Sequence, residues 1–160
     1  MYALNESLAF LLNRTGVVVA SAFTLELKER GLSLSMWRVL AALWGAGGQT
    51  LSGLAEVASI EVSTLSRQVG SLVEKGLVHR EQSGLHWRSV NIGLTAAGRD
   101  LVEQLVPAVA RHEAAALDDV SVADARRLKL LLDKIYANLI ALDQAHLTEK
   151  PGRRKGQITT

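Results

Sequence analysis

The fold of this chain is decided by residues 51–76, LSGLAEVASIEVSTLSRQVGSLVEKG. Two short helical patterns follow each other there, one over Leu51–Ser59 and one over Val62–Lys75, with a break at Ile60-Glu61. An apolar stripe at i, i+4 and i+7 runs along the second helix and comprises Leu65, Val69 and Leu72. The first helix is expected to bury Leu54, Ala55 and either Val57 or Ala58. The stretch therefore predicts a helix-turn-helix.

The segment that follows Gly76 changes from a helical period to the alternating period of β-strands. Residues Leu77–Gln82 and His86–Leu94 predict two strands that are joined by a turn at Ser83-Gly84-Leu85. A hairpin directly after a helix-turn-helix is a wing. The central region thus predicts a winged helix-turn-helix.

Helices are also predicted on both sides of this region. Upstream, Ser33 or Ser35 caps a helix over Met36–Trp44, whose apolar stripe is Trp37, Leu40, Ala41 and Trp44. Downstream, Thr95 caps a helix that runs to Leu117, with Pro107 as a kink or local irregularity. A turn over residues 118–121 leads into a last helix over Val122–His146.

The first helix, over Leu4–Glu29, is apolar on more than one face and stops at Gly31. Such a helix is buried on several sides. Two arrangements remain open: the central helix of a monomeric bundle, or a helix packed partly against a second subunit.

The composition is that of an ordinary globular domain, with 160 residues, 48% hydrophobic and 21% charged. The formal net charge is +2, but residues 149–160 hold four of the 18 basic side chains and one of the 16 acidic ones. Residues 1–148 therefore carry 14 basic against 15 acidic side chains. Any binding to nucleic acid must rest on a local arrangement of residues.

Several classes of function are excluded or disfavoured. The absence of cysteine excludes disulfides, thiolate metal sites and thiol redox sensing. The four histidines lie far apart, and no zinc-protease, phosphate-loop or hydrolase motif is present, so we expect no enzyme, no metal and no cofactor. No signal peptide is recognisable, and Asn13 and Arg14 interrupt the one long apolar region. These features predict a cytoplasmic protein that does not enter a membrane.

Five fragments in order resemble one family: Leu32–Leu40, Leu51–Ala55, Ser63–Arg67, Val73–Val78 and Leu94–Gly98. Together with the long flanking helices, they are similar to the multiple antibiotic resistance regulator (MarR) family of winged-helix repressors. The resemblance covers nearly the whole chain. It implies a mainly α fold with a small β-hairpin wing, a winged helix-turn-helix with interlocking N- and C-terminal dimerisation helices.

The resemblance also implies an organisation into parts. Residues 1–32 and 96–147 would form the dimerisation helices of a homodimer, and residues 33–95 the DNA-binding domain. Two such domains would bind a near-palindromic double-stranded operator. Residues 148–160 have almost no apolar content and are expected to form a basic, mobile tail.

The outward face of the helix over Val62–Lys75 suits a DNA groove. Its N-terminal half carries small hydroxyl side chains and one arginine, namely Ser63, Thr64, Ser66 and Arg67. Small side chains let the helix approach the floor of the major groove, and arginine can bond guanine with two hydrogen bonds. The alternative for Arg67 is an ion pair with Glu74 or Glu61.

The wing departs from the family pattern. Members usually carry Asp-x-Arg near the wing tip, and here the arginine position matches Arg88 while His86 replaces the aspartate and Trp87 lies between them. Arg88 is expected to enter the minor groove, or else to be a solvated charge at the strand end. His86 is a candidate DNA contact, or simply exposed.

Charges across Leu51–Thr95 balance, with Arg67, Lys75, Arg80 and Arg88 against Glu56, Glu61, Glu74 and Glu81. Phosphate binding is therefore expected to use backbone amides and hydroxyls as well as cations.

The resemblance further implies a small anionic, aromatic or acyl effector, which would include thioesters of coenzyme A, that releases the repressor from DNA. Arg14 lies in the middle of an apolar helix and is the best candidate for its carboxylate anchor, because an unpaired buried cation is costly. Trp37 and Arg38 are the second candidates. The alternative is that Arg14 pairs with Glu6 or with an acid of a partner chain. A rival function is a helical adaptor that binds proteins and no DNA.

Overall fold

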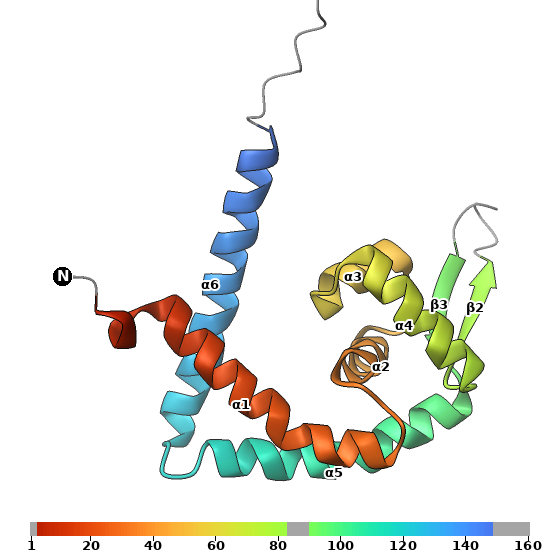
Figure 1. Cartoon of the computed structure of the whole chain (residues 1–160), viewed down its shortest axis with the longest axis horizontal. Helices are drawn as coiled ribbons and strands as arrows, with labels where there is room; N and C mark the ends of the chain where they lie inside the picture. The colour runs from red at the N-terminus through yellow and green to blue at the C-terminus, as the bar shows by residue number, and fades with distance from the viewer. Residues whose placement is uncertain (1–2, 83–89, 149–160) are drawn as a thin grey trace, which may run out of the picture. The chain divides into compact units, whose positions relative to one another are not determined.

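The structure, a computed structural model, describes the backbone of residues 3–82 and 90–148, and their side chains up to Leu142. It divides into two compact units after Ala116. The first unit contains, in chain order, η1 (Leu4–Glu6), α1 (Leu8–Glu29), α2 (Leu34–Ala46), β1 (Gln49–Thr50), α3 (Leu51–Ala58), α4 (Val62–Glu74), β2 (Val78–Gln82), β3 (Val90–Leu94) and α5 (Ala96–Ala116). The second contains α6 (Val122–Thr148). The predicted class, mainly α with a small antiparallel sheet, is confirmed (Figure 1).

The core of the first unit is built around α4. The predicted stripe of Leu65, Val69 and Leu72 is completely buried. Around it lie buried residues of α2, α3, β2 and β3, together with Phe23 and Leu27 from the end of α1. The start of α5 adds Gly98, Val102, Leu105 and Ala108. Because the core reaches into both α1 and α5, it extends beyond residues 33–95.

The sheet has three antiparallel strands in the order β1-β3-β2. The wing strands pair in register from Val78 opposite Leu94 to Gln82 opposite Val90. A two-residue strand, β1, pairs Gln49 with Ile92 on the other side of β3. The strand β1 was not predicted from the sequence, because two residues are too few to show an alternating pattern.

Helix ends follow the expected chemistry. Of the two candidate caps of α2, Ser33 is the one used, and its hydroxyl accepts a hydrogen bond from the Met36 amide at 3.2 Å. Thr50 caps α3 in the same way, through the Gly53 amide. Gly31 and Gly76 follow α1 and α4 with φ of 64° and 71°, a conformation that favours glycine.

Two predictions made from the sequence about these helices are wrong. The buried face of α2 is Val39, Leu40 and Leu43, while Trp44 is 43% exposed. The buried face differs from the predicted aromatic stripe because α2 packs against three helices, α3, α4 and α5. These contacts decide which side chains of α2 are buried. In α3, the prediction of either Val57 or Ala58 is confirmed, since Ala58 is buried and Val57 is exposed. The first helix begins only at Leu8, after a separate 3-10 turn over Leu4–Glu6 that ends at Ser7.

Gly98 allows a very close approach between α5 and the start of the wing. A Cβ atom at this position would lie 2.0 Å from the backbone oxygen of Leu77. Beside it, the Thr95 hydroxyl donates to the Gly76 carbonyl at 2.7 Å and accepts from the Gly98 amide at 3.0 Å. Thr95 is thus the predicted cap, and it also ties α5 to the end of α4. Beyond it, α5 continues through Pro107 as an unbroken helix.

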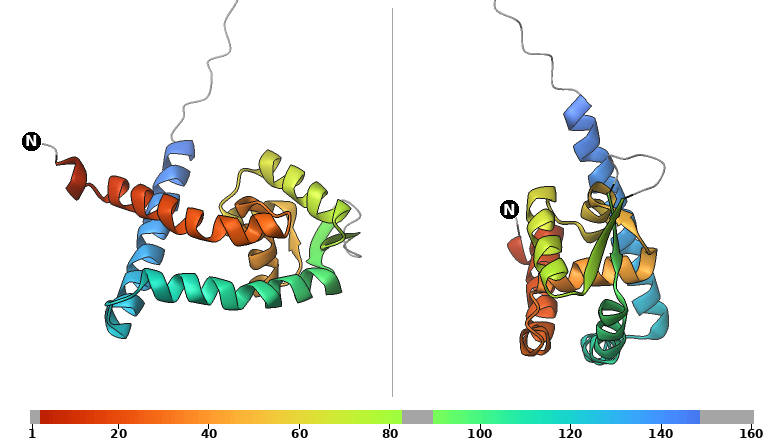
Figure 2. Two further views of the ribbon diagram at one scale, coloured as in Figure 1. Left: turned by 60° about the horizontal axis from the view of Figure 1, so that its bottom comes forward. Right: turned by 90° about the vertical axis from the view of Figure 1, so that its right-hand side faces the viewer.

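Most of the apolar surface of α1 is exposed. Only Phe23 and Leu27 are buried, and they anchor its C-terminal half beside α5 (Figure 2). The exposed apolar side chains of the N-terminal part are Leu8, Leu11, Leu12, Val17, Val18 and Val19. By length and composition alone, α1 could cross a membrane, so Asn13 and Arg14 do not exclude a span as expected. If residues Leu8–Glu29 crossed a membrane, however, Phe23 and Leu27 could no longer pack in the core of the first unit.

The second unit is the single long helix α6. Ser121 caps it, because its hydroxyl accepts a hydrogen bond from the Asp124 amide at 3.1 Å. Apolar side chains are exposed along its length: Val122, Leu128, Leu130, Leu131, Leu132, Tyr136, Leu139, Ile140 and Leu142. A helix with this much exposed apolar surface requires a partner surface.

Candidate nucleic-acid interface

The outward face of α4 is formed as the sequence indicates. Ser63 and Arg67 are exposed, and Thr64 and Ser66 are half-buried on its flanks. Since Leu65 and its stripe are fixed in the core, these four side chains lie on the solvent side of a firmly packed helix. Small hydroxyl groups beside one arginine form a low polar surface that can approach base edges closely.

The N-terminus of α4 is capped by Glu61. Its carboxylate accepts hydrogen bonds from the Thr64 amide at 3.1 Å and from the Ser63 hydroxyl. This capping role of Glu61 was not predicted from the sequence. One consequence concerns Ser63: its hydroxyl hydrogen is already used, so its oxygen can accept a hydrogen bond from a base but has no hydrogen left for a phosphate.

These hydrogen bonds lower the pKa of Glu61. The largest cause is the Ser63 hydroxyl, followed by the backbone amides of Ser63 and Thr64, with the charge of Arg67 adding to them. A carboxylate whose pKa falls on folding stabilises the fold above its unfolded pKa. That contribution disappears as the pH drops through the lower, folded pKa.

Replacing Glu61 by glutamine should therefore destabilise the protein at neutral pH and make less difference in acid. We expect the urea midpoint of Glu61→Gln to lie below that of wild type at pH 7, and the gap to shrink well below about pH 4.3, the usual pKa of glutamate. Glu61→Asp should stay close to wild type, because aspartate is a favoured cap. A gap of equal size at both pH values would contradict capping by the ionised carboxylate.

Arg67 lies along the same face, and no acid of the described ranges holds it in a salt bridge. Its guanidinium Nη2 donates to the Thr64 hydroxyl at 3.4 Å. Among the described residues, no salt bridge within 4.0 Å joins it to Glu61 or Glu74. The ion-pair alternative is not observed, so the arginine keeps most of its hydrogen-bond donors available.

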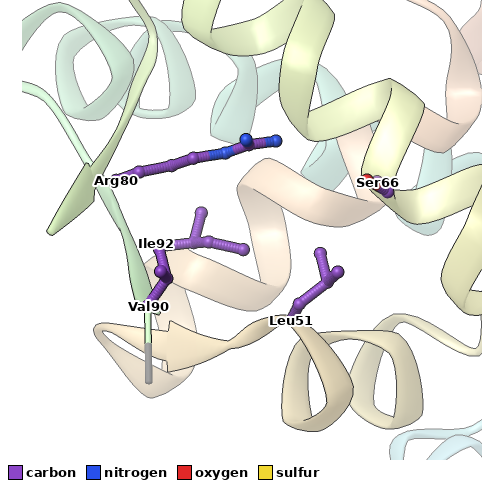
Figure 3. A pocket seen from close by; sticks show the side chains of 5 residues that line it. All are labelled: Leu51, Ser66, Arg80, Val90 and Ile92. Carbon is purple, nitrogen blue, oxygen red and sulfur yellow. The ribbon is translucent and has the colours of Figure 1, made fainter. Parts of the chain in front are cut away.

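A hollow of about 220 Å³ lies between α4 and the wing strands. Its lining is Leu51, Ser66, Arg80, Val90 and Ile92. Figure 3 shows the Arg80 side chain extending from β2 across the hollow toward the helix that carries Ser66. Arg80 was counted in the sequence analysis as one charge among eight. The structure places it beside a residue of the proposed DNA-contacting face.

Comparison with known proteins agrees with this geometry. The sequence model of the MarR family matches residues 32–84. An HTH-type transcriptional repressor of Mycobacterium tuberculosis, Rv2887, is 29% identical over 128 residues, which are 80% of this chain and 92% of the relative. A MarR family transcriptional regulator from Silicibacter pomeroyi has 29% identity and a TM-score of 0.77, covering 85% of this chain and 92% of its own.

The chain is similar to MarR family regulators both in the sequence of its helix-turn-helix and in its fold. It is a DNA-binding transcriptional regulator of the repressor type, and the expectation that it is not an enzyme is confirmed. A further solved structure of the same fold is Bordetella bronchiseptica BpsR, whose DNA binding is regulated by 6-hydroxynicotinic acid. BpsR is 24% identical with a TM-score of 0.77, and the match covers 85% of this chain and 97% of BpsR.

The wing tip and the tail lie outside the part of the chain that the structure describes. His86, Trp87 and Arg88 lie outside the described residues, as does the turn over residues 83–85. The last described pair of the hairpin is Gln82 opposite Val90. Of the tail, residues 149–160 also lie outside.

The three candidate effector residues have separate environments. Arg14 lies on the exposed part of α1, with its guanidinium carbon 5.6 Å from the centre of the Phe10 ring. Arg14 was expected to be buried. Only the last two turns of α1, however, pack into the core of the single chain. Among the described residues, no ion pair joins Arg14 to Glu6.

Trp37 and Arg38 are held by contacts within the fold. The half-buried Trp37 packs edge to face against Phe23, with ring centres 5.4 Å apart. The guanidinium of Arg38 donates to the Ser59 carbonyl at 3.1 Å and so satisfies a carbonyl at the end of α3.

Proposed function

We propose that this chain represses transcription by binding a near-palindromic operator as a homodimer. Residues 33–95 bind DNA in this proposal, residues 1–32 and 96–147 supply the dimerisation helices, and residues 148–160 are a basic tail. The protein works in the cytoplasm, where its operator is. Exposed apolar surface on α1 and α6 supports the dimer, because a folded monomer rarely leaves so much of it in water.

The observation that carries the proposal is the outward face of α4. Its inner stripe is fully buried and its outer face is small, hydroxylated and carries Arg67 with no acid within 4.0 Å among the described residues. Such a helix can enter the major groove with Ser63, Thr64 and Ser66 close to the bases. Arg88 and His86 of the wing are proposed to reach the adjacent minor groove.

Replacing Arg67 by alanine should weaken operator binding and relax its sequence preference at one position. A lost bidentate contact to a base costs about 1–3 kcal/mol per half-site. Fluorescence anisotropy with the operator and with single-base variants measures both effects. Arg99→Ala, which removes an exposed arginine of α5, controls for the lost charge and should bind like wild type.

An Arg67→Ala variant with unchanged affinity for every operator variant would show that α4 does not read bases. A protein whose binding to duplex DNA shows no salt dependence, or no binding at all, would favour the helical adaptor instead, since phosphate contacts make DNA binding strongly salt-dependent.

We also propose that a small anionic, aromatic or acyl compound releases the repressor from DNA. The fold supports this, because BpsR shares it and responds to 6-hydroxynicotinic acid. Arg14 remains the proposed carboxylate anchor, since the exposed part of α1 around it would be covered in a dimer and its guanidinium forms no ion pair among the described residues. Trp37 and Arg38 are secondary candidates, because each already has a partner in the fold.

A further inference from the structure

Arg80 occupies an unusual position in the wing. It pairs with Ile92 in the sheet, and Val78, two residues earlier, pairs with Leu94. Side chains two residues apart on a strand lie on the same face, and Val78, Ile92 and Leu94 on this face are buried. Arg80 is thus a cation on the inward face of the sheet, the face that meets α4.

Within the described part of the chain, the guanidinium of Arg80 has no acidic partner on this face. Its neighbours His79 and Glu81 lie on the opposite face, where their side chains approach each other at 4.0 Å. Among the described residues, no carboxylate lies within 4.0 Å of Arg80. A cation on the inward face is tolerated because the hollow beside α4 opens to solvent, and Arg80 remains exposed. The site therefore has a free positive charge and room for an anionic group.

The position of the hollow indicates which anion reaches it. In the proposed complex, α4 lies in the major groove and the wing reaches the adjacent minor groove. One sugar-phosphate strand separates two adjacent grooves of a duplex, so it must pass between α4 and the wing. The hollow lies between these same two elements, with Ser66 on one side and Arg80 on the other (Figure 3).

We propose that Arg80 binds a phosphate of the DNA strand that crosses this hollow. The inference rests on the proposed function, and it adds a residue that anchors the duplex without reading its sequence. A guanidinium matches two phosphate oxygens with its planar fork. Arg67 would then read bases from α4, while Arg80 fixes the backbone between helix and wing and sets the distance between them.

The hollow also has an apolar lining, formed by Leu51, Val90 and Ile92. This lining suits a second kind of anionic ligand. A small aromatic carboxylate could place its ring on this surface and its charge on Arg80. We favour the phosphate because Ser66, on the DNA-contacting face of α4, lines the same hollow. The experiment below separates the two sources.

The test compares Arg80→Gln with wild type on two duplexes, the operator and a scrambled sequence of equal length, over a series of salt concentrations. Glutamine keeps a polar side chain but removes the charge. We expect the dissociation constants for both duplexes to rise by a similar factor, on the order of tenfold per half-site. The slope of log affinity against log salt should fall by about 0.9 for each lost phosphate contact.

Arg80→Lys is the matched variant. An ammonium group still neutralises a phosphate but lacks the planar fork. It should keep the wild-type salt slope and recover most of the affinity. Thermal melting of both variants separates a folding defect from a lost contact, because a structural role would lower the melting temperature of Arg80→Gln and leave its salt slope unchanged.

Unchanged affinity and salt slope in Arg80→Gln would overturn the proposal. It would also be overturned if DNA binding were unchanged while sodium benzoate, used as a small aromatic carboxylate, protected wild type but not the variant against thermal unfolding. Failure of the proposed function has a different signature: wild type would then bind neither duplex, or Arg67→Ala would bind the operator and its variants like wild type.

Discussion

Gly98→Ala is expected to destabilise the winged unit by about 3 kcal/mol, enough to unfold a large fraction of a marginally stable domain. The added methyl group would lie 2.0 Å from the Leu77 carbonyl oxygen and 3.3 Å from a methyl carbon of Leu94. The first of these is backbone, so no side-chain rotation relieves the clash. Either α5 moves away, which breaks the hydrogen bonds of Thr95, or β2 shifts and disturbs the wing.

Urea unfolding followed by circular dichroism measures the effect. Gly45→Ala is the matched control, since Gly45 lies within α2 and a methyl group there meets nothing within 4 Å. It should be neutral or stabilise by up to about 1 kcal/mol, because alanine favours a helix over glycine. Equal unfolding midpoints for the two variants would show that α5 and β2 do not approach as closely as described.

Val18→Glu is expected to dissociate the proposed homodimer. Val18 is 62% exposed in the single chain and lies on the apolar part of α1 that needs a partner surface. A two-fold dimer contains the substitution twice, and an unpaired carboxylate buried on each side costs at least about 1.5 kcal/mol. The dimer dissociation constant should therefore rise about a hundredfold or more, and operator binding should fall with it.

Light scattering over a concentration series detects the change directly. Val57→Glu introduces the same charge at an exposed valine of α3, outside the proposed dimer surface, and should leave the protein dimeric. A Val18→Glu protein that stays dimeric at low micromolar concentration would place the interface elsewhere, and a monomeric wild type would contradict the dimer itself.

The parts of the fold that the sequence predicts well are those with a strong local pattern. The stripe Leu65, Val69 and Leu72 predicts α4 and its buried face, and Thr95 predicts the start of α5, because each depends on spacing or capping within one element. Where several elements meet, the pattern fails. Trp44 is exposed because the elements packed on α2 cover Val39, Leu40 and Leu43 instead, and β1 is too short to have a pattern.

The candidate site was predicted in part, for similar reasons. The four outward residues of α4 follow from helical spacing alone. Glu61 and Arg80 were missed, although a signal existed for each: an acid three residues before the Thr64 amide is a possible cap, and Arg80 alternates with Val78 on the inward side of a strand. Their roles depend on the loop conformation and on the distance between helix and wing, which no local pattern contains.

The capped ends of α4 have a consequence for the thermodynamics of binding. Glu61 satisfies amides at its N-terminus, Gly76 follows its C-terminus and the inner stripe is buried, all in the protein alone. The helix that meets the bases is therefore ordered before DNA arrives. Binding to DNA therefore carries no entropic cost for ordering α4. The free energy of its contacts with DNA is then available to discriminate between sequences.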